Sequence, residues 1–71
     1  MFYIRDKVFG RYVVSIVPTK SNKRVIYFGE KPTGARWVTR KGAEGALDKI
    51  RNAAETNPPG VADALEVVEI N

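Results

Sequence analysis

The sequence predicts a small α+β domain: an antiparallel sheet of three strands, one helix packed across it, and a C-terminal strand. Two observations carry this prediction. The first forty residues contain short runs rich in β-branched and aromatic residues, separated by turn signals. Residues 43–54 repeat apolar side chains at three- and four-residue spacing, as a helix does. A length of 71 residues allows one domain, residues 1–71, with a β-β-β-α-β order.

The first two strands are expected to form a hairpin. Residues 11–17 are rich in Val, Ile and Tyr, and Pro18 ends the run. Strict alternation predicts that three side chains of this strand share one buried face: Tyr12, Val14 and Ile16. Residues 20–23 are polar and turn-forming, so residues 24–28 are expected to return antiparallel to the first strand.

Two further extended segments flank the hairpin. Residues 35–39 are predicted to form a short third strand, after a loop marked by Pro32 and Gly34. Residues 1–8 are predicted to be an additional extended segment that ends at the Phe9-Gly10 turn.

The helix is expected to begin after Thr39, whose hydroxyl can accept a hydrogen bond from a first-turn amide. Its apolar stripe over residues 43–54 is mostly alanine, so the helix should lie close to the sheet with Leu47 and Ile50 as anchors. Two prolines and a glycine in residues 57–60 end it.

The C-terminal segment combines two patterns. Residues 61–65 are compatible with a short helical turn, whereas residues 66–70 alternate in the manner of a strand. We expect this strand to return to the sheet.

Charge is distributed unevenly along the chain. Residues 1–41 carry ten basic and two acidic side chains, a net charge of +8. Residues 42–71 carry two basic and six acidic side chains, a net charge of −4. The total of +4 therefore conceals a bipolar molecule, in which the strand-rich part is cationic and the helix and tail are anionic.

The composition excludes several classes of function. Because the chain has neither cysteine nor histidine, it can form no disulfide, no Cys/His zinc site and no Ser–His or Cys–His catalytic pair. We expect no catalytic residues, no metal site and no cofactor. No apolar run approaches the roughly 20 residues that span a bilayer, and no signal peptide is recognised, so the expected location is the cytoplasm.

The candidate binding residues are basic side chains of the strands, loops and helix start, together with one aromatic residue. They are Lys20, Lys23, Arg24, Lys31, Arg36, Trp37, Arg40 and Lys41. Basic residues interleaved with aromatic ones are typical of nucleic-acid surfaces, and Thr39 to Lys41 lead into helix amides that suit a phosphate. The alternative is that Tyr12, Tyr27 and Trp37 belong to the core under the helix and that the lysines serve solubility.

The stretch Trp37-Val38-Thr39-Arg40-Lys41-Gly42-Ala43-Glu44, following a strand-rich segment, carries a resemblance. Residues 11–55 resemble the arm-type DNA-binding domains at the N-terminus of phage and transposon tyrosine recombinases. In that family a three-stranded sheet docks in the major groove, which implies a DNA-facing role for four residues: Lys23, Arg24, Arg36 and Trp37. The additional strand at 66–70 is similar to small stand-alone phage accessory proteins, some of which bind host proteins.

Together these observations predict a non-catalytic binding protein whose basic sheet side contacts nucleic acid, most simply double-stranded DNA. The alternative is a protein–protein interaction module, such as a phage-type accessory protein or inhibitor of a host protein. That module would use an exposed sheet edge or an apolar patch, and its partner would be another protein or a second copy of the chain in a homodimer.

Overall fold

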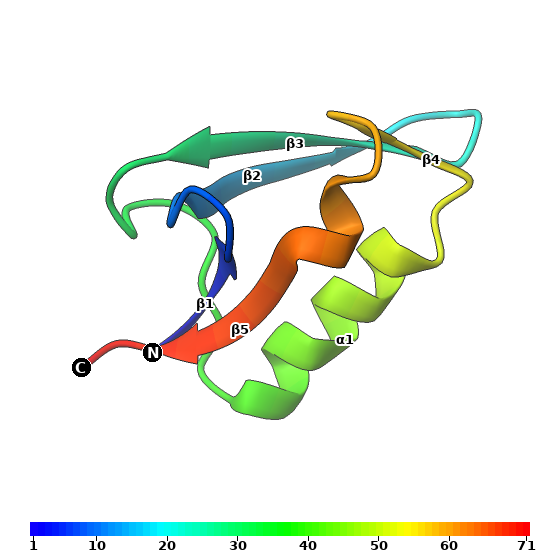
Figure 1. Cartoon of the computed structure of the whole chain (residues 1–71). Coiled ribbons are helices and arrows are strands. Elements are labelled where there is room, and N and C mark those ends of the chain that lie inside the picture. The colour runs from blue at the N-terminus through cyan, green and yellow to red at the C-terminus, as the bar shows by residue number, and fades with distance from the viewer.

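Five strands of the chain form one mixed sheet that carries a helix on one face (Figure 1). The structure is a computed structural model that describes residues 1–71. Its elements are β1 (Phe2–Asp6), β2 (Tyr12–Pro18), β3 (Lys23–Gly29), α1 (Arg40–Arg51), β4 (Glu55–Asn57), the 3₁₀ turn η1 (Val61–Ala64) and β5 (Leu65–Glu69). The strand order is β4-β3-β2-β1-β5. The α+β class is confirmed, but the expected three-stranded antiparallel sheet is wrong, because β4 joins β3 in parallel.

The N-terminal strand β1 lies inside the sheet, between β2 and β5. Its whole length pairs antiparallel with β5, from Phe2 opposite Glu69 to Asp6 opposite Leu65. Its pairing with β2 is confined to Arg5 and Tyr12. The predicted return of the C-terminal strand to the sheet is therefore confirmed, and the extended segment expected at residues 1–8 proves to be the partner that receives it.

The third strand expected at residues 35–39 is wrong. This segment crosses between β3 and α1 and makes a single β-bridge, in which Trp37 and Phe2 exchange backbone hydrogen bonds of 2.8 and 2.9 Å. The Ala35 amide donates to the Val14 carbonyl, 3.0 Å away. Since β1 and β2 diverge beyond one pair, the segment makes one bridge to β1 and one hydrogen bond to β2, and it builds no ladder with either.

The face predicted for β2 is wrong in part, because the strand contains a β-bulge between Val13 and Ser15. An extra residue in one strand reverses the alternation of side chains beyond it. Val13 lies opposite Phe28 and Ile16 opposite Ile26, so Val13 and Ile16 face the core.

The helix begins where the sequence predicts. Thr39 is the N-cap, and its side-chain oxygen accepts a hydrogen bond of 3.0 Å from the Gly42 amide. Leu47 and Ile50 are fully buried, which confirms both anchors. The helix ends at Arg51, earlier than the alanine stripe suggests, because the next residues extend into β4.

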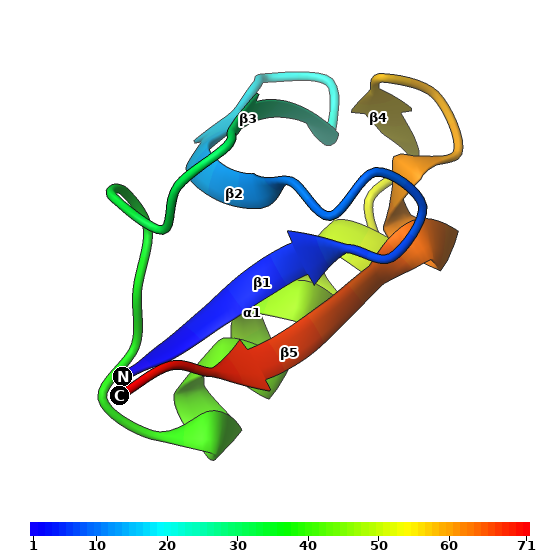
Figure 2. The same cartoon turned by 60° about the vertical axis from the view of Figure 1, so that its left-hand side comes forward.

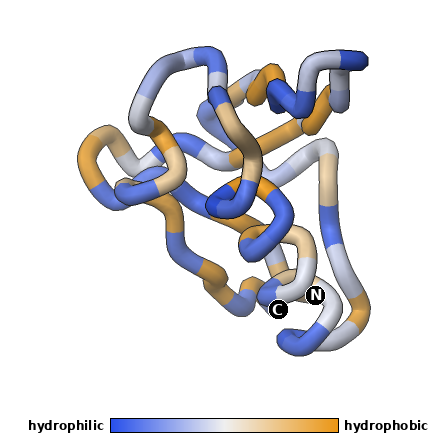
Figure 3. The backbone as a smooth tube through the Cα atoms, turned by 90° about the vertical axis from the view of Figure 1, so that its right-hand side faces the viewer, coloured by the Kyte–Doolittle hydropathy of each residue, from blue (hydrophilic) through white to orange (hydrophobic).

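The core lies between α1 and the inner face of the sheet. Six buried side chains form it: Ile4, Val13, Ile26, Leu47, Ile50 and Leu65. The turn η1 packs Val61 and Ala62 against the same cluster, so the helical alternative for residues 61–65 is confirmed. Along the tube in Figure 3, hydrophobic and hydrophilic positions alternate at short intervals. No helix is both long and apolar enough to span a bilayer.

Candidate nucleic-acid interface

The β2–β3 hairpin ends in a tip that its own hydrogen bonds fix. The Thr19 amide donates to the Lys23 carbonyl at 2.9 Å, and the Thr19 hydroxyl donates to the same carbonyl at 3.1 Å. The Lys23 amide in turn donates to the Thr19 hydroxyl oxygen at 3.3 Å. Asn22 adopts a φ of 57°, a left-handed conformation that asparagine tolerates better than most residues. The turn therefore presents its side chains in a defined geometry.

Three of the predicted cations belong to this end of the hairpin, where Lys23 and Arg24, as successive residues of β3, point to opposite faces of the sheet. Lys20 is exposed, whereas Lys23 and Arg24 at the start of β3 are half-buried. None of the three forms an ion pair. The cations that do form one are Arg5, Arg11 and Arg51. Lys23 is aligned with Glu55 of β4 in the parallel register. That carboxylate is the acidic group nearest to the tip along the sheet.

A second set of cations lies at the start of α1, where Arg36, Arg40 and Lys41 are all exposed. The first turn of the helix contains no acidic residue. Arg40 stacks over the Phe2 ring, with its guanidinium carbon 5.2 Å from the ring centre. The Thr39 cap occupies the Gly42 amide, so one of the free amides expected to receive a phosphate already has a partner.

The eight predicted residues do not share one face. The hairpin tip lies at the upper right of Figure 1 and the start of α1 at the lower left. Lys31 follows the far end of β3, and seven residues of strand separate that end from the tip by about 20 Å. The structure thus gathers Lys20, Lys23 and Arg24 and separates them from the other candidates.

The aromatic residues divide between core and surface. Trp37 is half-buried, packs against the core cluster and lies against the first turn of α1 near Gly42. Tyr12 meets Tyr3 edge-to-face, with ring centres 6.2 Å apart. Tyr27 is 54% exposed on the sheet face opposite the helix. Among these rings only Tyr27 is free to stack on a ligand.

Sequence reasoning missed a polar cluster at the β1–β2 turn. Asp6 is only 3% exposed, and it accepts hydrogen bonds from the amides of Val8 (2.8 Å) and Phe9 (3.4 Å) and from Arg11 Nη2 (3.2 Å). Burial raises the pKa of Asp6, but the bonds from Val8, Arg11 and Phe9 together outweigh it and hold the pKa below its ordinary value.

The Arg11 guanidinium of this cluster also lies between two rings. Its central carbon is 4.9 Å from the centre of the Phe9 ring and 4.7 Å from that of Phe28. Phe9 itself is 73% exposed. An aspartate placed shortly before Gly10 was the available signal, because aspartate often accepts bonds from amides two residues further along a turn.

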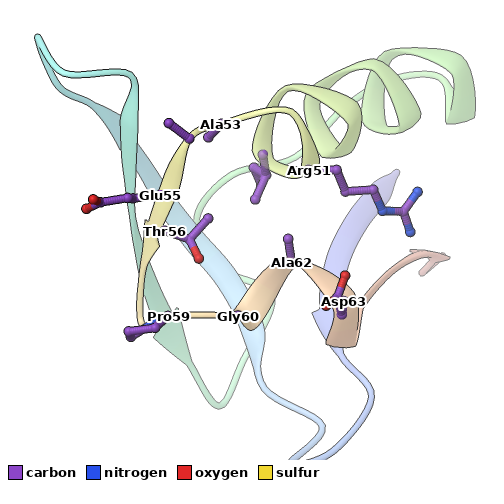
Figure 4. A pocket seen from close by; sticks show the side chains of 10 residues that line it. Arg51, Ala53, Glu55, Thr56, Pro59, Gly60, Ala62 and Asp63 are labelled. Carbon is purple, nitrogen blue, oxygen red and sulfur yellow. The ribbon is translucent and has the colours of Figure 1, made fainter.

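A cavity of about 420 Å³ lies between the end of α1, β4 and η1 (Figure 4). Its charged side chains do not converge, because Glu55 points away from Arg51 and Asp63 in that view. No three acidic residues are close enough together to share a metal ion.

No protein-family model matches this chain, and no curated protein or solved structure matches it either. The resemblance to recombinase arm-type domains therefore stays a prediction.

Proposed function

We propose that this protein is a small non-catalytic binding protein that contacts double-stranded DNA through the tip of the β2–β3 hairpin. The observation that carries the proposal is the cluster of three cations without ion pairs, Lys20, Lys23 and Arg24, on a turn held by its own hydrogen bonds. No acidic residue occurs between Lys7 and Gly29, so the hairpin itself carries no carboxylate, and Glu55 of the neighbouring β4 lies beside Lys23.

The shape of the hairpin supports the same proposal. The major groove is about 12 Å wide and admits a β-ribbon, so the turn at residues 19–22 can enter it while β4 lies beside Lys23–Val25. Lysine and arginine at its tip would neutralise backbone phosphates, and this contact supplies affinity without reading the sequence. Tyr27, four residues after Lys23, offers an exposed ring on the same strand.

Fluorescence anisotropy with a random duplex tests the proposal. Three phosphate contacts predict that affinity falls about 40-fold between about 50 and 200 mM salt. The triple variant Lys20→Gln/Lys23→Gln/Arg24→Gln should abolish both the binding and its salt dependence.

A matched triple variant removes the same charge elsewhere: Arg36→Gln/Arg40→Gln/Lys41→Gln. It should retain most of the binding, because its cations lie at the other end of the molecule. Equal losses in the two variants would show that net charge alone drives binding. An absence of binding at the lower salt would refute the function itself.

A further inference from the structure

Strand β5 forms one margin of the sheet, and no element lies beyond it in the strand order (Figure 2). The direction of its backbone groups follows from its hydrogen bonds to β1. Ile70 exchanges bonds with Met1, and the Ala64 carbonyl accepts from the Lys7 amide. Phe2 lies opposite Glu69, but its backbone amide and carbonyl point away from β5 and form hydrogen bonds with Trp37.

In an antiparallel ladder, hydrogen-bonded and non-bonded pairs alternate. Glu66 and Val68 therefore face β1 with their backbone groups, whereas the amides and carbonyls of Val67 and Glu69 point out of the sheet. The Leu65 amide is already used by Ala62 of η1. Two consecutive outward positions, Val67 and Glu69, thus offer unpaired donors and acceptors in strand geometry.

The two margins of the sheet differ in how well they are protected. At the other margin, β4 is only three residues long and is followed by Pro58 and Pro59, and both features block the addition of a strand. β5 has five residues and contains no lysine, no proline and no bulge. Its backbone is therefore open to pairing.

The charge around this edge defines what can pair with it. Residues 61–69, which form η1 and β5, contain no lysine or arginine, but they contain three acidic residues: Asp63, Glu66 and Glu69. Glu66 is paired with Arg5 at 3.0 Å, whereas Glu69 is exposed and forms no ion pair. A strand added here would carry its side chains about 5 Å from those of β5, within reach of opposite charges.

We propose that the free edge of β5 binds an extended segment of a partner protein that carries basic side chains at alternate positions. The segment pairs with the backbone of Val67 and Glu69, and one of its cations lies beside the Glu69 carboxylate. This is the mode in which a peptide adds a strand to an exposed sheet edge. A second copy of the chain fits less well, because it would bring two acidic edges together. The inference is independent of DNA binding, which uses the opposite part of the chain.

The test uses a blocked, fluorescent eight-residue peptide of alternating lysine and valine. Amide hydrogen exchange, followed by NMR, is the first measurement. In the free protein the Val67 and Glu69 amides should exchange readily, whereas those of Glu66 and Val68 are protected. Saturating peptide should slow exchange at Val67 and Glu69 at least tenfold and leave the other two unchanged.

Two substitutions at one position separate the backbone contact from the charge. Glu69→Pro removes an outward N–H that has no partner within the chain, so the fold should tolerate it while peptide affinity falls at least tenfold. Glu69→Ala keeps the N–H and removes only the carboxylate, which should weaken binding by less than about fivefold. A peptide with glutamate in place of lysine should not bind.

Three results would overturn the proposal. Equal weakening by Glu69→Pro and Glu69→Ala would show a purely electrostatic contact. Protection of Val67 and Glu69 that appears without peptide and grows with protein concentration would show that a second copy occupies the edge. Unchanged exchange at both amides with saturating peptide would show that the edge is not the docking site. The hairpin triple variant should bind the peptide normally, so a failure of DNA binding leaves this test intact.

Discussion

Replacing the buried carboxylate of Asp6 with an amide should cost a large part of the stability of this domain. The amide oxygen of Asp6→Asn can still accept from Val8, 2.8 Å away. Its NH₂ group would confront the Arg11 guanidinium, which now donates at 3.2 Å. Loss of one charge-assisted bond and weakening of the others should lower the free energy of unfolding by about 2 kcal/mol.

That change is large against the total. A chain of 71 residues is expected to have a free energy of unfolding of only about 4 to 11 kcal/mol. The melting temperature should therefore fall by about 8 to 16 °C at neutral pH. Urea unfolding of wild type and variant, followed by tryptophan fluorescence, gives both the free energy and its slope with denaturant.

The pH dependence of this difference is the sharper test. The folded pKa of Asp6 is lowered, so its contribution is fully present above the unfolded pKa of about 3.9. It is lost as the pH falls through the folded pKa. The gap between wild type and Asp6→Asn should accordingly be constant from pH 7 to pH 5 and close below about pH 4.

Asp48→Asn is the matched control, because Asp48 is exposed and its ion pair with Arg51 is long, at 4.0 Å. Exposed ion pairs of this kind contribute about 0 to 1 kcal/mol, so this variant should unfold almost as wild type does. A gap for Asp6→Asn that is absent at pH 7, or that persists unchanged to pH 2, would refute the role assigned to the buried carboxylate.

Substitutions at four further positions test the local structure, and circular dichroism melts check each of them. A Cβ at Gly34 would lie 2.6 Å from the Val14 Cα, so Gly34→Ala should destabilise by about 1 to 3 kcal/mol. Gly45→Ala meets no atom within 4 Å and should stabilise α1 by up to about 1 kcal/mol; the reverse order of the two would contradict the packing described. Thr39→Ala should cost about 1 kcal/mol through loss of the N-cap, and Thr39→Ser should restore most of it. Trp37→Ala should lower the free energy of unfolding by about 3 kcal/mol. This is near the lower end for a large aromatic residue, because the ring is only half-buried. An unchanged melting temperature would place the ring outside the core.

Local patterns predicted the elements that have strong local signals. The hairpin at residues 12–29, the cap at Thr39, and the anchors Leu47 and Ile50 follow from β-branched runs, a hydroxyl before the helix and apolar spacing. The bulge in β2 has no such signal. Val13 and Val14 are the same residue type, and only the pairing with β3 decides which of them faces inward.

Two other errors come from contacts distant in sequence. Residues 35–39 have the composition of a strand, but the gap between diverging β1 and β2 admits just one bridge at Trp37. β4 spans Glu55–Asn57, of which only Thr56 favours a strand, and it forms because the helix end places these residues beside β3.

The candidate site was predicted only as a set of residue types. Charge counting along the chain identified a cationic half, but it carries no information on which cations meet in space. The local spacing of Lys20, Lys23 and Arg24 placed them together, because they share one turn. Lys31 and Arg36 come later in the chain, after the seven-residue strand β3 has carried the backbone away from the tip.

The pairing of β1 with β5 also determines when the fold can be completed. Phe2 and Glu69 are neighbours in the sheet but lie far apart in sequence, so Phe2 is synthesised well before its partner. Closing so long a loop is slow, and until it closes β1 keeps one unpaired edge. A nascent chain of which only β1 to α1 has left the ribosome would therefore expose the unpaired edge of β1. During synthesis on the ribosome, this protein should remain protease-sensitive until its C-terminal strand emerges.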